Sequence, residues 1–190
     1  MTQDFSNYNK EDNSLRIYTA GPLFTPDQLD TCEKVEKMTD KLGFDVFSPR
    51  LAVGGKFDKN AEPAERERQA KMIFDANILH MRDCDIMIAN LDDKDTGTTF
   101  ELAWAYAVGK PVIAYSKFGH GANIMLSQAV DVYCPTLGVL EVVLHNYKKV
   151  LDEDKLSTGA DKGMLKVALH KSLVFSEEKL GIKLTRYSDE

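Results

Sequence analysis

The chain has 190 residues, which suits one domain with a modest extension, because domains usually contain roughly 100–200 residues. Hydrophobic residues make up 43% and charged residues 28% of the chain, and these values exclude a disordered or fibrous protein. The net charge of −6 argues against a surface that binds a nucleic acid polymer or an acidic membrane.

No segment of the sequence predicts export or membrane insertion. The N-terminus is polar and lacks an apolar signal core, and no apolar run approaches the ~20 residues that a spanning helix needs. The three cysteines are odd in number and never stand at Cys-x-x-Cys spacing, so neither a disulfide framework nor a thiolate zinc site is predicted. We expect a cytoplasmic protein in which residues 1–13 form a flexible arm.

Strands and helices alternate in the first half of the chain. Thr25 and Gln28 are spaced as a capping box around a proline at the first helical position, and Gly43 stands where the following helix would end. The expected elements are a strand at 15–20, a helix at 26–42, a strand at 44–49, a glycine-containing loop at 50–60 and a helix at 62–81.

The alternation continues in the second half, where two strands are almost continuously apolar, as expected for strands covered on both faces. The expected elements are strands at 85–90, 110–115 and 130–134, helices at 100–108, 123–130 and 137–151, an acidic turn-rich loop at 91–98 and a glycine loop at 116–122. This order predicts an α/β fold, specifically a flavodoxin-like, doubly wound, mainly parallel five-stranded sheet with helices on both faces.

We assign residues 14–151 to a catalytic domain and residues 152–190 to a C-terminal extension. The extension begins with a polar stretch and continues with a segment of helical periodicity at 164–175. Such a helix could dock on its own domain or on a neighbouring subunit, and the sequence does not distinguish these positions. Open parallel sheets bind ligands outside the carboxyl ends of their strands, so the catalytic and binding residues are expected at those ends.

Glu101 is the main candidate because it follows a buried strand and lies near a predicted helix start. Backbone N–H groups and the helix dipole at such a position favour a carboxylate, so we expect Glu101 to be ionised at neutral pH. An ionised, positioned carboxylate is what a nucleophile at an anomeric carbon must be. The spacing from Thr98 to Glu101 also fits a capping box, which would give Glu101 a purely structural role.

Other polar residues have two interpretations each. Tyr18, near the end of the first strand, could bind a carboxylate or a sugar, or could be an ordinary strand tyrosine. Asn77, among apolar neighbours, could bind a base edge or be a satisfied core asparagine. Asp92, Asp93 and Asp95 could bind sugar hydroxyls or a metal, or form a solvated turn.

Several familiar motifs are absent from the sequence. It contains no Gly-x-Gly-x-x-Gly dinucleotide fingerprint and no P-loop. The four histidines do not form a His-Glu-x-x-His pair, and no Gly-x-Ser-x-Gly nucleophile elbow is present.

Four segments, in this order, resemble the nucleoside 2-deoxyribosyltransferase family. The most specific one combines an acidic residue, a Gly-x-x-apolar-Glu turn and a Gly-Lys-Pro-Val strand. The segments are IYTAGPLF at 17–24, FDANILHMRDCDIMIANL at 74–91, DTGTTFELAWAYAVGKPVIAY at 95–115 and NIML at 123–126.

The resemblance implies roles for the catalytic candidates. Glu101 falls on the family nucleophile, Tyr18 on the tyrosine that orients it, and Asp95 on an acid that contacts the substrate. Asn77 stands where some members have an aspartate that handles the base, and an amide can bind a base but cannot protonate it.

The resemblance also implies a homo-oligomer. Asn123 and Met125 match a sugar-contacting asparagine and a packing methionine in a segment that an adjacent subunit can supply. We therefore expect both residues near or across a subunit interface. Gly21, Asp92 and Gly97, at the carboxyl ends of the predicted strands, complete the expected substrate-binding set.

The implied activity is transfer of 2-deoxyribose between nucleobases in nucleotide salvage, through a covalent ester on Glu101. The expected partners are deoxynucleosides and free nucleobases, without a metal or organic cofactor. One alternative is a 2′-deoxynucleoside 5′-monophosphate N-glycosidase with water as acceptor. Another is a nucleoside-sensing module without catalysis. The negative net charge fits neutral substrates that bring no phosphate.

Overall fold

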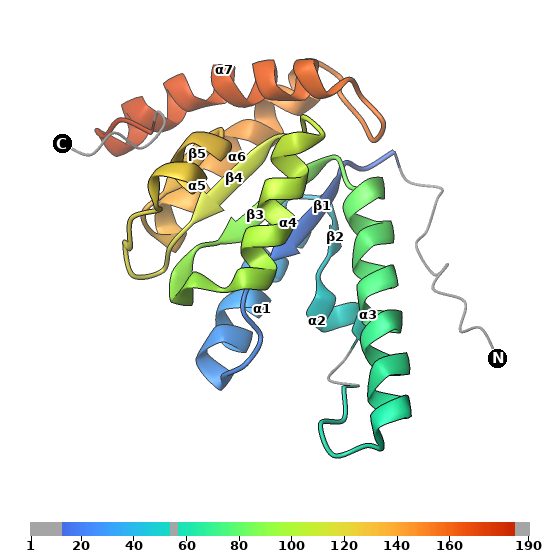
Figure 1. The fold of residues 1–190 in the computed structure, drawn as a ribbon. Coiled ribbons are helices and arrows are strands. Elements are labelled where there is room, and N and C mark those ends of the chain that lie inside the picture. Colours follow the sequence, from blue (N-terminus) through green and yellow to red (C-terminus); the bar gives the residue numbers. More distant parts are fainter. Residues whose placement is uncertain (1–12, 54–56, 185–190) are drawn as a thin grey trace.

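A computed structural model describes residues 13–53 and 57–184 and contains a five-stranded parallel sheet (Figure 1). The strand order is β2-β1-β3-β4-β5, and every neighbouring pair is parallel, which confirms the predicted flavodoxin-like topology. The strands are β1 (Arg16–Ala20), β2 (Asp45–Phe47), β3 (Ile86–Asn90), β4 (Val112–Tyr115) and β5 (Val132–Cys134). Apart from Asn13, the arm predicted at residues 1–13 lies outside the described residues.

Helices cover both faces of the sheet (Figure 1). Within the described ranges, no helix is both long enough and apolar enough to cross a bilayer. The helices are α1 (Pro26–Lys41), α2 (Pro49–Val53), α3 (Pro63–Asp83), α4 (Thr96–Ala107), α5 (Ile124–Ala129), α6 (Leu137–Glu153) and α7 (Lys162–Leu180), and η1 (Asp92–Lys94) is a 3₁₀ turn.

Alternate strand residues supply two separate cores, because successive side chains of a strand point to opposite faces. Ile17 and Ile88 join the core under α1, α6 and α7. Met87 and Ala89, one position away, join the core under α3, α4 and α5. Burial on both faces explains why the central strands are nearly continuous apolar runs.

The ends of the first helix agree with the sequence. Thr25 and Gln28 form the expected capping box, in which each side chain accepts a hydrogen bond from the other residue's backbone N–H. Gly43 adopts a positive φ of 82°, which a glycine tolerates without strain. The loop predicted at 50–60 is wrong at its start: α2 begins with Pro49, whose fixed φ suits the first position of a helix. Residues 54–56 of that loop lie outside the described residues.

The C-terminal helix packs on its own chain. Leu165, Leu169 and Leu173 of α7 are buried in the same core as the strands and α6. The buried Tyr147 hydroxyl of α6 donates to the backbone oxygen of Leu165 at 2.9 Å. The sequence allowed this helix to dock either on its own domain or on a neighbouring subunit, and in the structure it docks on its own domain.

This packing predicts that Leu169→Ala destabilises the protein. The Leu169 side chain is fully buried, and truncation of a buried leucine costs about 2–5 kcal/mol. The matched control is Val167→Ala on the same helix, where the side chain is 58% exposed and the cost should stay within about 0.5 kcal/mol. Urea unfolding of the full chain measures both free energies. Equal stability of the two variants would contradict the packing.

Candidate active site

A tyrosine of the sheet and a glutamate of a covering helix meet in the buried interior. The hydroxyl of Tyr18, in β1, donates to Oε1 of Glu101, in α4, at 2.5 Å. Tyr18 is fully buried, and only 9% of Glu101 is exposed. β1 and β3 are neighbouring strands. The chain continues from β1 to β2 on one side of the sheet and from β3 to β4 on the other side. Such a switch point is the usual ligand site of this fold.

Burial controls the charge of this pair. The pKa of Glu101 is raised from 4.5 to about 7. Loss of solvent is the largest cause, the Tyr18 hydrogen bond lowers the pKa, and the Asp95 charge raises it. Burial and the Glu101 charge raise the pKa of the Tyr18 phenol far above its usual value. Tyr18 therefore stays a neutral donor, and Glu101 exchanges its proton near neutral pH. The sequence predicted an ionised Glu101 at neutral pH, whereas a pKa of about 7 leaves the carboxyl group partly protonated there, because burial disfavours the charged form.

The helix that carries Glu101 begins earlier than the sequence indicated. Asp95 is its N-cap, and the carboxylate accepts the Thr98 N–H and hydroxyl, each at 2.8 Å. Glu101 therefore lies in the second turn, beyond the N–H groups that a cap satisfies. The prediction of a capping box between Thr98 and Glu101 is wrong, and the Glu101 side chain accepts a hydrogen bond from the Tyr18 hydroxyl instead.

Asp95 and Gly97 shape the start of α4. A Cβ atom at Gly97 would lie 3.2 Å from Asp95 Oδ2, a tighter contact than most side chains tolerate. The charge of Asp95 also contributes to the raised pKa of Glu101, so the structure brings Tyr18, Asp95 and Glu101 together. Asp95 differs from the other two catalytic candidates because its carboxylate caps the start of α4.

Phe47 and His80, which the sequence did not single out, form a series of aromatic contacts that begins at Tyr18. The Phe47 ring lies 5.2 Å from the Tyr18 ring, and the His80 ring stacks on Phe47 with centroids 3.6 Å apart. Burial lowers the pKa of His80, which favours its neutral form. The position of His80 among apolar residues was the available signal, but the stacking depends on a strand distant in sequence.

Asn77 lies on the same helix, one turn before His80. Its Oδ1 atom is buried and has no hydrogen-bond partner within the described part of the chain. Buried polar atoms are nearly always paired, so this oxygen is suited to accept from a ligand. The Phe74 and Phe100 rings, 6.5 Å apart, connect this part of α3 to the residue before Glu101.

The predicted substrate residues Gly21 and Asp92 have structural contacts. A Cβ atom at Gly21 would lie 3.3 Å from both Asn90 Cβ and Cys32 Sγ, so this turn passes close to the end of β3. Asp92 is buried, and its carboxylate accepts from the Ser116 hydroxyl at 2.5 Å and from the Lys117 N–H at 2.8 Å. These bonds join the ends of β3 and β4.

Gln28 connects the two loops on either side of the site. Its Oε1 accepts the backbone N–H groups of Phe24 and Thr25, and its Nε2 donates to Asp93 Oδ2 at 2.8 Å. Asp93 has a positive φ of 62°, uncommon outside glycine, and this contact holds it in place. The sequence identified Gln28 only as part of a helix cap.

Asn123 and Met125 lie at the start of α5, a helix that packs against α4. Asn123 is the N-cap of α5, and its Oδ1 accepts the Leu126 N–H at 3.0 Å. The Met125 side chain is 76% exposed. Their proposed position near a subunit interface stays a prediction. Within residues 13–53 and 57–184, no three acidic, histidine or cysteine side chains are grouped so that they could hold a metal ion.

The fold and the buried pair define a flavodoxin-like protein with a carboxylate held by a phenol at the ligand-binding edge of its sheet. The nucleoside 2-deoxyribosyltransferase family model matches residues 17–150, and the chain belongs to this family. The resemblance noted in the sequence is thereby confirmed. A search of curated proteins gave no match.

Three solved structures are similar to this chain. A 2-deoxyribosyltransferase from Bacillus psychrosaccharolyticus is 30% identical, with 66% of this chain and 90% of that chain covered and a TM-score of 0.55. A conserved protein from Enterococcus faecalis is 22% identical, with coverages of 84% and 99% and a TM-score of 0.47. A CMP N-glycosidase from Clostridium botulinum is 18% identical, with coverages of 60% and 82% and a TM-score of 0.39.

Removal of the Tyr18 hydroxyl should raise the pKa of Glu101 above its value of about 7. The hydrogen bond favours the charged carboxylate, so Tyr18→Phe removes a stabilising contact from the ionised form. A carbon-13 NMR titration of the Glu101 carboxyl group measures the shift. Tyr106→Phe, at an exposed position of α4, is the control and should leave the titration unchanged. A lower pKa in Tyr18→Phe would contradict this arrangement.

The same pKa predicts how stability depends on pH. The folded pKa of about 7 exceeds the unfolded value of 4.5, so the favourable contribution is complete below pH 4.5 and is lost as pH rises through 7. Relative to Glu101→Gln, the unmodified protein should lose roughly 3 kcal/mol of unfolding free energy across this range. Urea unfolding at a series of pH values measures the difference, and parallel profiles would contradict the buried carboxyl.

Proposed function

We propose that the protein transfers 2-deoxyribose between nucleobases through a covalent ester on Glu101. The observation that carries this proposal is the 2.5 Å hydrogen bond from the Tyr18 hydroxyl to Glu101 Oε1 in a buried site. The phenol occupies one carboxylate oxygen and fixes the plane of the group. The other oxygen, Oε2, is then the atom that reacts. Family membership supports a nucleoside or nucleotide as the substrate.

In the first step, an electron pair of Glu101 Oε2 attacks C1′ of a 2′-deoxynucleoside. The C1′–N bond breaks, the base leaves with its electron pair and takes a proton from water, and a 2-deoxyribosyl ester remains. A pKa of about 7 gives a substantial ionised fraction at neutral pH and a carboxylate more basic than an exposed one. Asn77 can bind the base through hydrogen bonds, but its amide group is not acidic enough to protonate the leaving base.

In the second step, a nitrogen of another base attacks C1′ from the face that the first base left. The ester C–O bond breaks, its electron pair returns to Glu101, and the incoming base loses a proton to water. Two inversions give net retention, as in a retaining glycosidase whose water is replaced by a base. Tyr18 donates to the carboxylate at the start and at the end of the cycle.

The first loop supports a neutral nucleoside over a nucleoside 5′-monophosphate. Loop N–H groups are the usual ligands of a phosphate at a strand end. Here the Phe24 and Thr25 N–H groups already donate to Gln28 Oε1, at 2.8 and 2.9 Å. Lys117, at the end of β4, is paired with Asp27. A phosphate would have to displace these contacts.

Glu101→Gln should reduce base exchange by more than about a thousandfold, because the amide is a poor nucleophile. Chromatography of deoxynucleoside and base pairs measures exchange, and mass spectrometry of the quenched enzyme detects the ester on the unmodified protein alone. Glu178→Gln, an exposed substitution on α7, is the matched control and should retain full exchange.

The substrates discriminate between the proposed transferase and the alternatives. Exchange with thymidine and a second base, without exchange of a ribonucleoside, supports the transferase. Release of free sugar phosphate from thymidine 5′-monophosphate would favour the N-glycosidase. Tight nucleoside binding without turnover, unchanged in Glu101→Gln, would favour a sensing module.

A further inference from the structure

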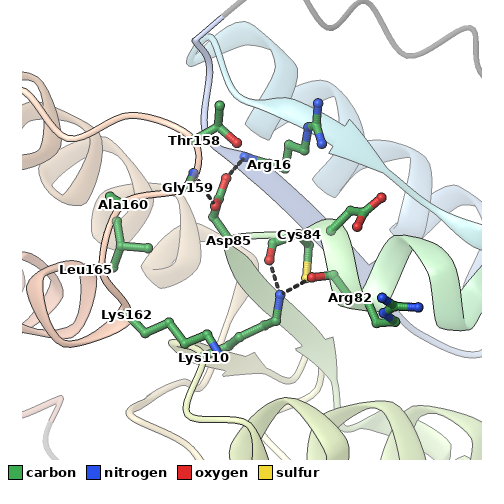
Figure 2. Close-up of a pocket in the computed structure, with 11 residues that line it drawn as sticks. Arg16, Arg82, Cys84, Asp85, Lys110, Thr158, Gly159, Ala160, Lys162 and Leu165 are labelled. Atoms are coloured by element: carbon green, nitrogen blue, oxygen red, sulfur yellow. Dashed lines mark hydrogen bonds between the residues drawn. The ribbon is translucent and has the colours of Figure 1, made fainter.

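A pocket lies at the amino ends of the strands, whereas ligands of this fold usually bind at the carboxyl ends. It has a volume of about 350 Å³ and lies where the strands begin, with Arg16 at the start of β1, Asp85 just before β3 and Lys110 just before β4 (Figure 2). Pockets that bind small molecules usually have volumes of about 300–1,000 Å³. The pocket therefore has the capacity for a small metabolite.

One wall of this pocket comes from the C-terminal stretch. The family match ends at residue 150, whereas Thr158, Lys162 and Leu165 line the pocket. Asp85 fixes this wall, because its carboxylate accepts the backbone N–H groups of both Arg16 and Gly159, at 2.8 and 3.0 Å (Figure 2). The pocket is thus a seam between the family domain and the segment added to it.

The lining is cationic in a chain that is acidic overall. It contains four cationic side chains and two carboxylates. Arg16 pairs with Asp45, but no carboxylate pairs with Arg82, Lys110 or Lys162 within the described ranges. Three cations without acidic partners around one pocket produce a positive potential that a bound anion would neutralise.

Lys110 is the most unusual of these cations because only 4% of it is exposed. Its ammonium group donates to the backbone oxygens of Arg82 and Cys84, at the end of α3 (Figure 2). The ammonium also lies 5.7 Å from the centroid of the Trp104 ring, and of its three donors one has no hydrogen-bond acceptor among the described residues. A buried charge is costly unless it is paired, and carbonyl oxygens satisfy it only in part.

We propose that this pocket binds a phosphate monoester. A monoester carries a charge of about −1.5 to −2 at neutral pH and three acceptor oxygens, which match the excess of cations in the lining. Arg82 supplies a planar guanidinium that can donate two bonds to one phosphate, and Lys110 and Lys162 supply ammonium donors. The pocket volume leaves room for a sugar-sized alcohol beside the phosphate.

Calorimetric titration of the full chain tests this site with 2-deoxyribose 5-phosphate, inorganic phosphate and neutral 2-deoxyribose as probes. The sugar phosphate should bind more tightly than inorganic phosphate, and the neutral sugar should not bind. Tighter binding of inorganic phosphate than of the sugar phosphate would contradict the monoester and would identify the ligand as the free ion. Saturating thymidine should leave the affinity unchanged, because the pocket is separate from the proposed nucleoside site.

Arg82→Gln and Lys162→Gln should each weaken the sugar phosphate by at least about tenfold, because each removes a charged donor. Both residues are exposed, so neither substitution disturbs a core. Lys179→Gln removes the same charge at the far end of α7 and should leave the affinity unchanged. Absence of binding at millimolar concentrations, or equal affinity in all three variants, would overturn the proposal. The readout does not depend on base exchange.

Discussion

The hydrogen bond between Tyr18 and Glu101 depends on nearly every level of the fold. A carboxyl group as buried as this one loses most of its hydration, and the phenol replaces part of what water would provide. The two residues come together only because β1 and β3 are adjacent strands and α4 follows β3 directly. The same burial raises the pKa of Glu101 to about 7, so the geometry and the reactivity of the carboxyl group have one cause.

Polar side chains around the site make hydrogen bonds to the backbone at the carboxyl ends of the strands. Asp95, Asp92 and Gln28 use their side chains to hold the backbone of α4, β4 and the first loop. Residues that the sequence suggested as ligands are therefore largely structural within one chain. Within the described residues, the buried oxygen of Asn77, on α3 one turn before His80, has no hydrogen-bond partner and is suited to accept from a ligand.

The strands and their order were predictable because a parallel sheet buried on both faces requires long apolar runs separated by helices. The start of α4 was not, since Asp95 and Thr98 are both good caps and only tertiary packing selects between them. The raised pKa of Glu101 was not predictable for a related reason: burial of its carboxyl group depends on β1, which is distant in sequence. The site of α7 was equally undetermined, because helical periodicity does not specify which surface the helix covers.

The packing of α7 has a consequence for the order in which the protein can mature on the ribosome. Leu165, Leu169 and Leu173 complete a core that also contains Leu15, just before β1, and Ile17 of β1. When α6 has just emerged from the ribosome, α7 has not yet been synthesised, and the apolar surface of α6 that α7 later covers is in contact with water. Synthesis of the final helix therefore precedes closure of the core, although the proposed catalytic residues emerged long before.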